Sequence, residues 1–139
     1  MANDVMILGQ ENGDHVSLKF INRVDPPDWP EPAMTFEVTG TSTGSRFRTF
    51  ETLVVVEDLK NFLDHLREAE TDNTVGGLLQ SAHQEISIKL RGQGTGTFDL
   101  DCEISDNPEL RKPTSRSFVL YPGDVPRLIQ QAEQILARM

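Results

Sequence analysis

The fold class is decided by residues 86–104, which read ISIKLRGQGTGTFDLDCEI. Apolar and polar residues alternate on both sides of a glycine-rich centre at 92–96. A period of two is typical of a strand that buries one face, because successive side chains point to opposite sides. Glycine supplies the backbone freedom that a tight turn needs. We therefore predict an antiparallel hairpin whose apolar face lies on a core.

The register of this hairpin follows from matching its apolar residues. If Arg91 lies opposite Thr97, the apolar pairs are Leu90 with Phe98, Ile88 with Leu100 and Ile86 with Cys102. A register that pairs apolar with apolar agrees with burial of one face. On the other face, the same register pairs Asp99 with Lys89, Asp101 with Ser87 and Glu103 with Glu85.

Further strands are expected on both sides of this hairpin. Strand patterns occur at 5–8, 16–20, 34–38, 46–56 and 118–120, and a short edge strand fits within 71–83. The alternation in 46–56 slips between Phe47 and Phe50, which predicts a bulge there. Residues 25–32 hold four prolines around Trp29. Proline has no N–H for a sheet ladder, so this segment is predicted to be an extended connector.

Two segments have the period of an amphipathic helix. Residues 57–69 place Leu59, Phe62, Leu63 and Leu66 on one stripe. The second helix runs from about residue 125 to the end, with Asp124 as its expected N-cap. We predict one α+β domain spanning 1–139, with an antiparallel sheet of about six to eight strands and both helices packed on one face. The expected order is β-β-β-β-α-β-β-β-α, which leaves Lys19, Glu37, Lys89, Asp99, Asp101 and Glu103 on an open face.

Composition excludes several classes of function. The net charge is −9 and no run of Lys and Arg is present, which argues against binding nucleic acid or an anionic membrane. No stretch approaches the roughly 20 apolar residues of a membrane span. The N-terminus lacks a basic segment, so no signal peptide is expected, and the single cysteine, Cys102, has no disulfide partner. These features predict a protein of the reducing cytoplasm. The negative charge would speed the encounter with a basic partner, but many acidic proteins have no such partner.

The candidate binding residues are Glu85, Asp101, Glu103 and Trp29. The three carboxylates fall close together in the predicted hairpin. They form a solvated face or a partner-binding patch, and acid–base catalysis is the weakest of the three interpretations. Trp29 either plugs the open end of the core or stands exposed as a binding anchor.

No cofactor or metal is predicted. His15, His65 and His83 are far apart in the chain and lack a second ligand at metal-binding spacing. Cys102 lies on the apolar face of its strand, which favours a core cysteine over a nucleophile. The glycines at 92–96 lead into a strand, whereas a phosphate-binding loop opens a helix.

The order of these motifs resembles the WapI-type immunity protein family of bacteria, over about residues 28–136. The similarity runs through Asp28-Trp29, the strand at 36–38, the helix at 59–66, Gly77-Leu78-Leu79, 85–90, the 92–96 turn, 98–106 and Leu128-Ile129. The chain departs from the family in its extra prolines after Trp29 and its long loop at 106–113.

These are mostly core and turn positions, so no contact residue carries over from the family. The resemblance implies a non-catalytic protein that binds and blocks a protein toxin. Two alternatives remain open: a secretion or assembly chaperone, and a small-ligand binder or enzyme. The identity of the partner and the oligomeric state stay open as well.

Overall fold

A computed structural model describes residues 4–10, 13–41, 49–105 and 114–138 of the chain. In this part the elements follow the order β-β-β-β-α-β-β-β-β-α. The elements are β1 (Val5–Gly9), β2 (His15–Val24), β3 (Ala33–Thr41), β4 (Phe50–Val55), α1 (Val56–Ala69), β5 (Gly76–Gln80), β6 (Ile86–Gly92), β7 (Phe98–Ile104), β8 (Thr114–Leu120) and α2 (Asp124–Leu136). The predicted α+β class is confirmed, and the expected short edge strand within 71–83 is β5.

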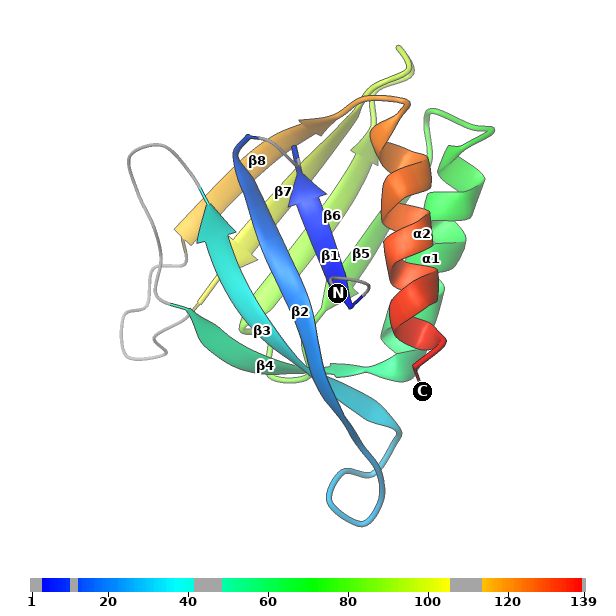
Figure 1. The fold of residues 1–139 in the computed structure, drawn as a ribbon. Coiled ribbons are helices and arrows are strands. Elements are labelled where there is room, and N and C mark those ends of the chain that lie inside the picture. Colours follow the sequence, from blue (N-terminus) through cyan, green and yellow to red (C-terminus); the bar gives the residue numbers. More distant parts are fainter. Residues whose placement is uncertain (1–3, 11–12, 42–48, 106–113, 139) are drawn as a thin grey trace.

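The strands form two antiparallel sheets, β1-β2-β3-β4 and β5-β6-β7-β8, rather than one continuous sheet. Figure 1 shows one sheet in front of the other. Each sheet buries one face, and residues of both belong to a single hydrophobic cluster that includes Phe36 and Leu18 from one and Ile88 and Leu100 from the other. Alternation indicates that a strand has one buried face but does not say which sheet the strand joins. The chain passes from the first sheet to the second through α1, which connects β4 to β5.

Both helices lie along one side of the strands, with α2 next to β1 and α1 next to β5 (Figure 1). The predicted stripe of α1 is confirmed, since Leu59, Phe62, Leu63 and Leu66 are all buried. The close approach of α1 to β5 requires a glycine. A Cβ atom on Gly77 would lie 2.8 Å from the Cβ of His65.

Polar side chains of α2 bond to the free edge of β1. Arg127 donates from Nη1 to the carbonyl of Ile7 and from Nη2 to that of Gly9, each at 2.7 Å. The amide N–H of Ile7 donates to Oε1 of Gln131 at 3.0 Å. These bonds replace those of a further strand, so the edge offers fewer groups to another chain.

The predicted N-cap of α2 is wrong. Gly123 holds the N-cap position, and no side chain bonds to the first amides of the helix. Oδ2 of Asp124 instead accepts from the Tyr121 amide at 2.9 Å and from Nε2 of Gln10 at 3.0 Å. Asp124 therefore ties the β8–α2 turn to the end of β1.

The predicted hairpin register is wrong by two residues, although every side chain is on its predicted face. The observed pairs are Leu90 with Leu100, Ile88 with Cys102 and Ile86 with Ile104. A shift of two keeps each side chain on its face, so the apolar pattern does not distinguish the two registers.

In the observed register, the hairpin forms hydrogen bonds with the loop between α1 and β5. The Gly92 amide donates to the Val75 carbonyl at 3.0 Å, and the Gly94 amide to the Asn73 carbonyl at 3.0 Å. The α1–β5 loop thus lies directly against the turn. A Cβ atom on Gly92 would be only 2.3 Å from the Asn73 oxygen, which explains the glycine.

The predicted bulge near Phe47 lies mostly outside the described residues, which resume at residue 49. Within the described part, β4 begins at Phe50, later than the predicted 46. An irregularity does occur in the same sheet, between Phe20 and Asn22 in the pairing of β2 with β3.

Candidate binding surfaces

The outer face of the β5–β8 sheet is a grid of twelve positions in three rows across the strands. The rows are Gly76, Arg91, Asp99, Val119; then Leu78, Lys89, Asp101, Ser117; and then Gln80, Ser87, Glu103, Ser115. The residues between them in each strand point inward to the core. We call this set the grid face. Lys19 and Glu37, predicted to share an open face with it, lie instead on the other sheet.

Asp101 and Asp99 of the grid face are held in place by neighbouring side chains. Arg91 Nη2 lies 2.7 Å from an oxygen of Asp101 and 3.8 Å from one of Asp99. Ser117 donates to Asp101 at 2.8 Å, and Gln93 donates to Asp99 at 2.6 Å. Because these groups are partly exposed, each pair contributes no more than about 1 kcal/mol to stability. Their main effect is to fix the orientation of the charges.

The other two predicted carboxylates have different surroundings. Glu103 is exposed and lies between Ser87 and Ser115, not opposite Glu85. Glu85 accepts a hydrogen bond from Oγ1 of Thr52, a buried residue of β4, at 2.9 Å. The fold therefore brings Asp101 and Glu103 onto one face and ties Glu85 to the other sheet.

Trp29 is half-buried in the connector between β2 and β3. Its ring meets that of His83 edge to face, with centroids 5.5 Å apart. His83 lies in the turn between β5 and β6. Trp29 thus joins a connector of one sheet to a turn of the other, and it is not a member of the central hydrophobic cluster.

Cys102 is completely buried, and burial raises the pKa of its thiol to about 12, with a smaller contribution from the charge of Asp101. Such a thiol is protonated at neutral pH and is a core group. Among the described residues, no three His, Cys, Asp or Glu side chains gather as metal ligands would. The described helices include none that is both long and apolar enough to span a membrane.

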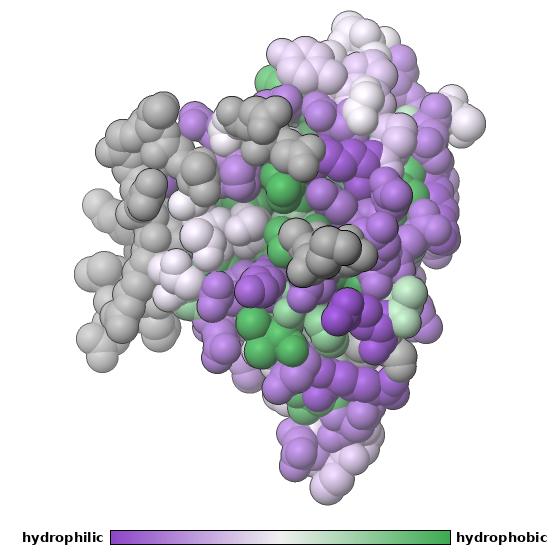
Figure 2. All heavy atoms as spheres, in the orientation of Figure 1, coloured by the Kyte–Doolittle hydropathy of each residue, from purple (hydrophilic) through white to green (hydrophobic). Residues whose placement is uncertain are grey.

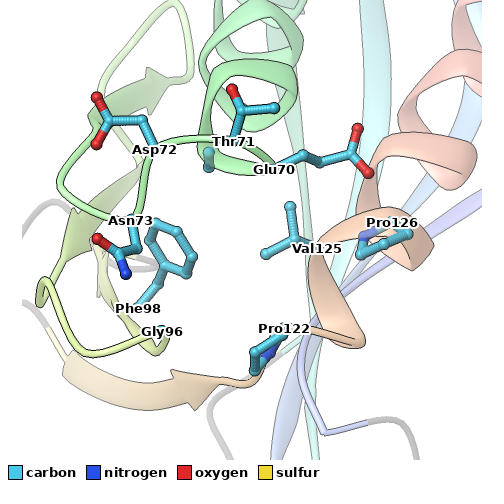
Figure 3. A pocket seen from close by; sticks show the side chains of 10 residues that line it. Glu70, Thr71, Asp72, Asn73, Gly96, Phe98, Pro122, Val125 and Pro126 are labelled. Atoms are coloured by element: carbon cyan, nitrogen blue, oxygen red, sulfur yellow. The ribbon is translucent and has the colours of Figure 1, made fainter.

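A hollow of about 420 Å³ lies at one end of the molecule. Its walls come from the end of α1 and the loop after it, the β6–β7 turn with the start of β7, and the β8–α2 turn with the start of α2. Figure 3 shows Phe98 and Val125 pointing toward one another across it, with Pro122 beside them. Sequence reasoning missed this site because its residues come from separate segments, and no local pattern joins them.

The front of the molecule is mostly hydrophilic where the described residues form its surface. Figure 2 shows a largely hydrophilic surface there, with small separate hydrophobic areas. Among the residues that the structure describes, four large hydrophobic side chains are exposed. Two of them belong to the β5–β8 sheet, Leu78 at 50% and Val119 at 43%, and Tyr121, at 54%, directly follows β8.

These features define a class of protein: a small acidic α+β protein that presents an open sheet face of fixed, mixed charges. The family model for the Immunity protein WapI-like family matches residues 6–139, and the chain belongs to this family. The predicted resemblance is confirmed, over a longer stretch than the motifs covered. A search of curated proteins finds no match to the chain.

Proposed function

We propose that this protein neutralises a protein toxin by binding to it directly. The observation that carries the proposal is the match to an immunity protein family over residues 6–139. The net charge of −9 supports a basic partner, because opposite charges speed the encounter of two proteins. Catalysis is not part of the proposed role.

We place the toxin-binding surface on the grid face. Binding surfaces combine apolar anchors with oriented polar groups. Leu78 and Val119 supply exposed apolar area at opposite edges of the grid face, and the Arg91 ion pairs hold the charges between them. Asp101 and Glu103 are the proposed acidic contacts. Glu85 and Trp29 border the β5–β6 turn and are proposed as contacts at the margin.

Co-expression tests the function. A toxin-like protein encoded by the neighbouring gene should stop growth when expressed alone and permit growth when this chain is co-expressed. Tagged chain should also retain that toxin in a pull-down. Continued growth arrest together with an empty pull-down would overturn the proposal.

Charge reversal tests the surface. Asp101→Lys combined with Glu103→Lys should weaken toxin binding by about tenfold or more, because oriented acidic contacts become repulsive. Glu37→Lys with Glu51→Lys is the matched control, since it makes the same charge change on the other sheet. Equal losses in both variants would mean that only overall charge matters and would remove the grid face from the interface.

A further inference from the structure

The hollow at the end of α1 has an apolar floor and a negatively charged rim. Phe98 and Val125 are buried residues whose side chains face each other across it, and Pro122 adds a third apolar surface. Of the residues that the structure describes, ten line the hollow, and none of these is basic. The carboxylate of Glu70 lies at the rim, on the side of α2, whereas that of Asp72 points away from the hollow (Figure 3).

The end of α1 adds negative charge beside the hollow. Helix α1 ends here, and the C-terminal end of a helix carries partial negative charge, which opposes the partial positive charge at the start of α2, where Val125 and Pro126 line the hollow. Residues 67–72, at the end of α1 and just after it, hold three carboxylates against one basic side chain, a net charge of −2. All three carboxylates are exposed. Hydrogen bonds from Thr74 lower the pKa of Asp72, so its charge persists at neutral pH.

The basic side chains of α1 do not cancel the charge at this end. Arg67 lies 3.3 Å from Asp64 and 3.8 Å from Glu133, and it does not line the hollow. Lys60 belongs to a different hollow, near the start of the helix. The Glu70 carboxylate therefore has no ion-pair partner within the described part of the chain.

We propose that this hollow receives a long basic side chain, such as arginine, from a protein partner. An arginine stem is apolar and its guanidinium group is planar and cationic, so the stem fits the floor while the charge meets Glu70. The volume of about 420 Å³ is ample for one side chain. That the partner is a toxin rests on the proposed function, whereas the argument that the hollow binds a basic side chain does not.

The test uses N-acetyl-arginine methylamide as the probe and follows amide shifts in the full chain by NMR. Titration should give saturable shifts at Thr71, Asn73 and Gly96, which lie around the hollow. The citrulline analogue has the same shape without the charge and should bind at least about threefold more weakly. Linear shifts spread over the surface, or equal affinity for both probes, would overturn the inference.

Two variants of the chain test whether the Glu70 carboxylate binds the probe. Glu70→Gln should weaken the arginine probe about threefold to fivefold, as expected for a partly exposed ion pair. Glu57→Gln, which removes an equal charge at the other end of α1, should leave the affinity within about 1.5-fold, because exposed charges that far apart are screened. An unchanged affinity in Glu70→Gln would also overturn the inference.

The two proposals fail in different ways. A chain that binds the arginine probe but not the neighbouring toxin would overturn the proposed function and leave the hollow as a site for another basic protein. Thr71→Trp places a large ring at the rim of the hollow. Toxin binding that survives Thr71→Trp unchanged would overturn the toxin as the partner that fills the hollow and leave the proposed function standing.

Discussion

At the scale of single residues, Cys102 is the clearest case of a group whose chemistry is set by the fold. The alternation of its strand predicts that it faces the core, and the structure buries it fully, next to Ile88 across the hairpin. Because burial raises its pKa to about 12, the folded thiol keeps its proton in a pH range where an exposed thiol loses it.

The stability of the protein should therefore fall as pH rises above about 9. In that range the unfolded chain binds fewer protons at Cys102 than the folded chain, so the free energy of unfolding decreases with pH, by at most about 1.4 kcal/mol per unit. Urea unfolding between pH 8 and 10.5 measures this slope. In Cys102→Ala the free energy of unfolding should fall less steeply with pH. Identical slopes in the two proteins would show that burial of Cys102 does not keep its thiol protonated.

Gly92 and Gly123 differ in how closely another backbone approaches them. Gly92 accommodates the α1–β5 loop, whereas Gly123, at the start of α2, has open space where its Cβ would be. The sequence predicts a turn from residue 92 onward but not the contact at Gly92, because Asn73 lies in a different segment of the chain.

Gly92→Ala should destabilise the protein by about 2 kcal/mol or more, because the new Cβ would clash with the Asn73 carbonyl unless the loop moves. Gly123→Ala, with a helical φ of −74° and open space, should change stability by less than about 0.5 kcal/mol. Thermal melts of the two variants check the pair. Equal losses would show that the loop contact is not what requires Gly92.

At the scale of elements, α2 both covers the core and closes the edge of β1. The spacing of its apolar residues predicts a core face of Val125, Leu128, Ile129, Ala132, Ile135 and Leu136. The first five are buried, and Leu136 is partly buried against the core. The bonds from Arg127 and Gln131 to β1 were not predictable, because they join residues more than a hundred positions apart. Helical periodicity shows which face is buried, but not which strand the polar flank meets.

Arg127→Ala should cost about 1–3 kcal/mol, because two carbonyls at the edge of β1 lose charged hydrogen-bond donors. Arg138→Ala removes the same charge from an exposed site just after α2 and should have little effect. Chemical denaturation measures both variants. A similar small change in the two would mean that water replaces the Arg127 bonds at no cost.

At the scale of the whole molecule, the fold separates the three carboxylates that the sequence places in one acidic patch, because Glu85 bonds to Thr52 of β4 while Asp101 and Glu103 lie on the grid face. Strand faces were predictable from period two, while the division into two sheets and the hairpin register depend on contacts between distant segments. The corrected register gives Asp101 the Arg91 partner that orients it. The hollow beside Glu70 likewise depends on loops that only the tertiary fold brings together.

The direct test of toxin neutralisation is a titration with purified proteins. The activity of the toxin encoded by the neighbouring gene is measured while this chain is added in increasing amounts. We predict that toxin activity falls in proportion to the amount of chain added and disappears once every toxin molecule has this chain bound. Undiminished toxin activity at about tenfold molar excess of the folded chain would contradict the account.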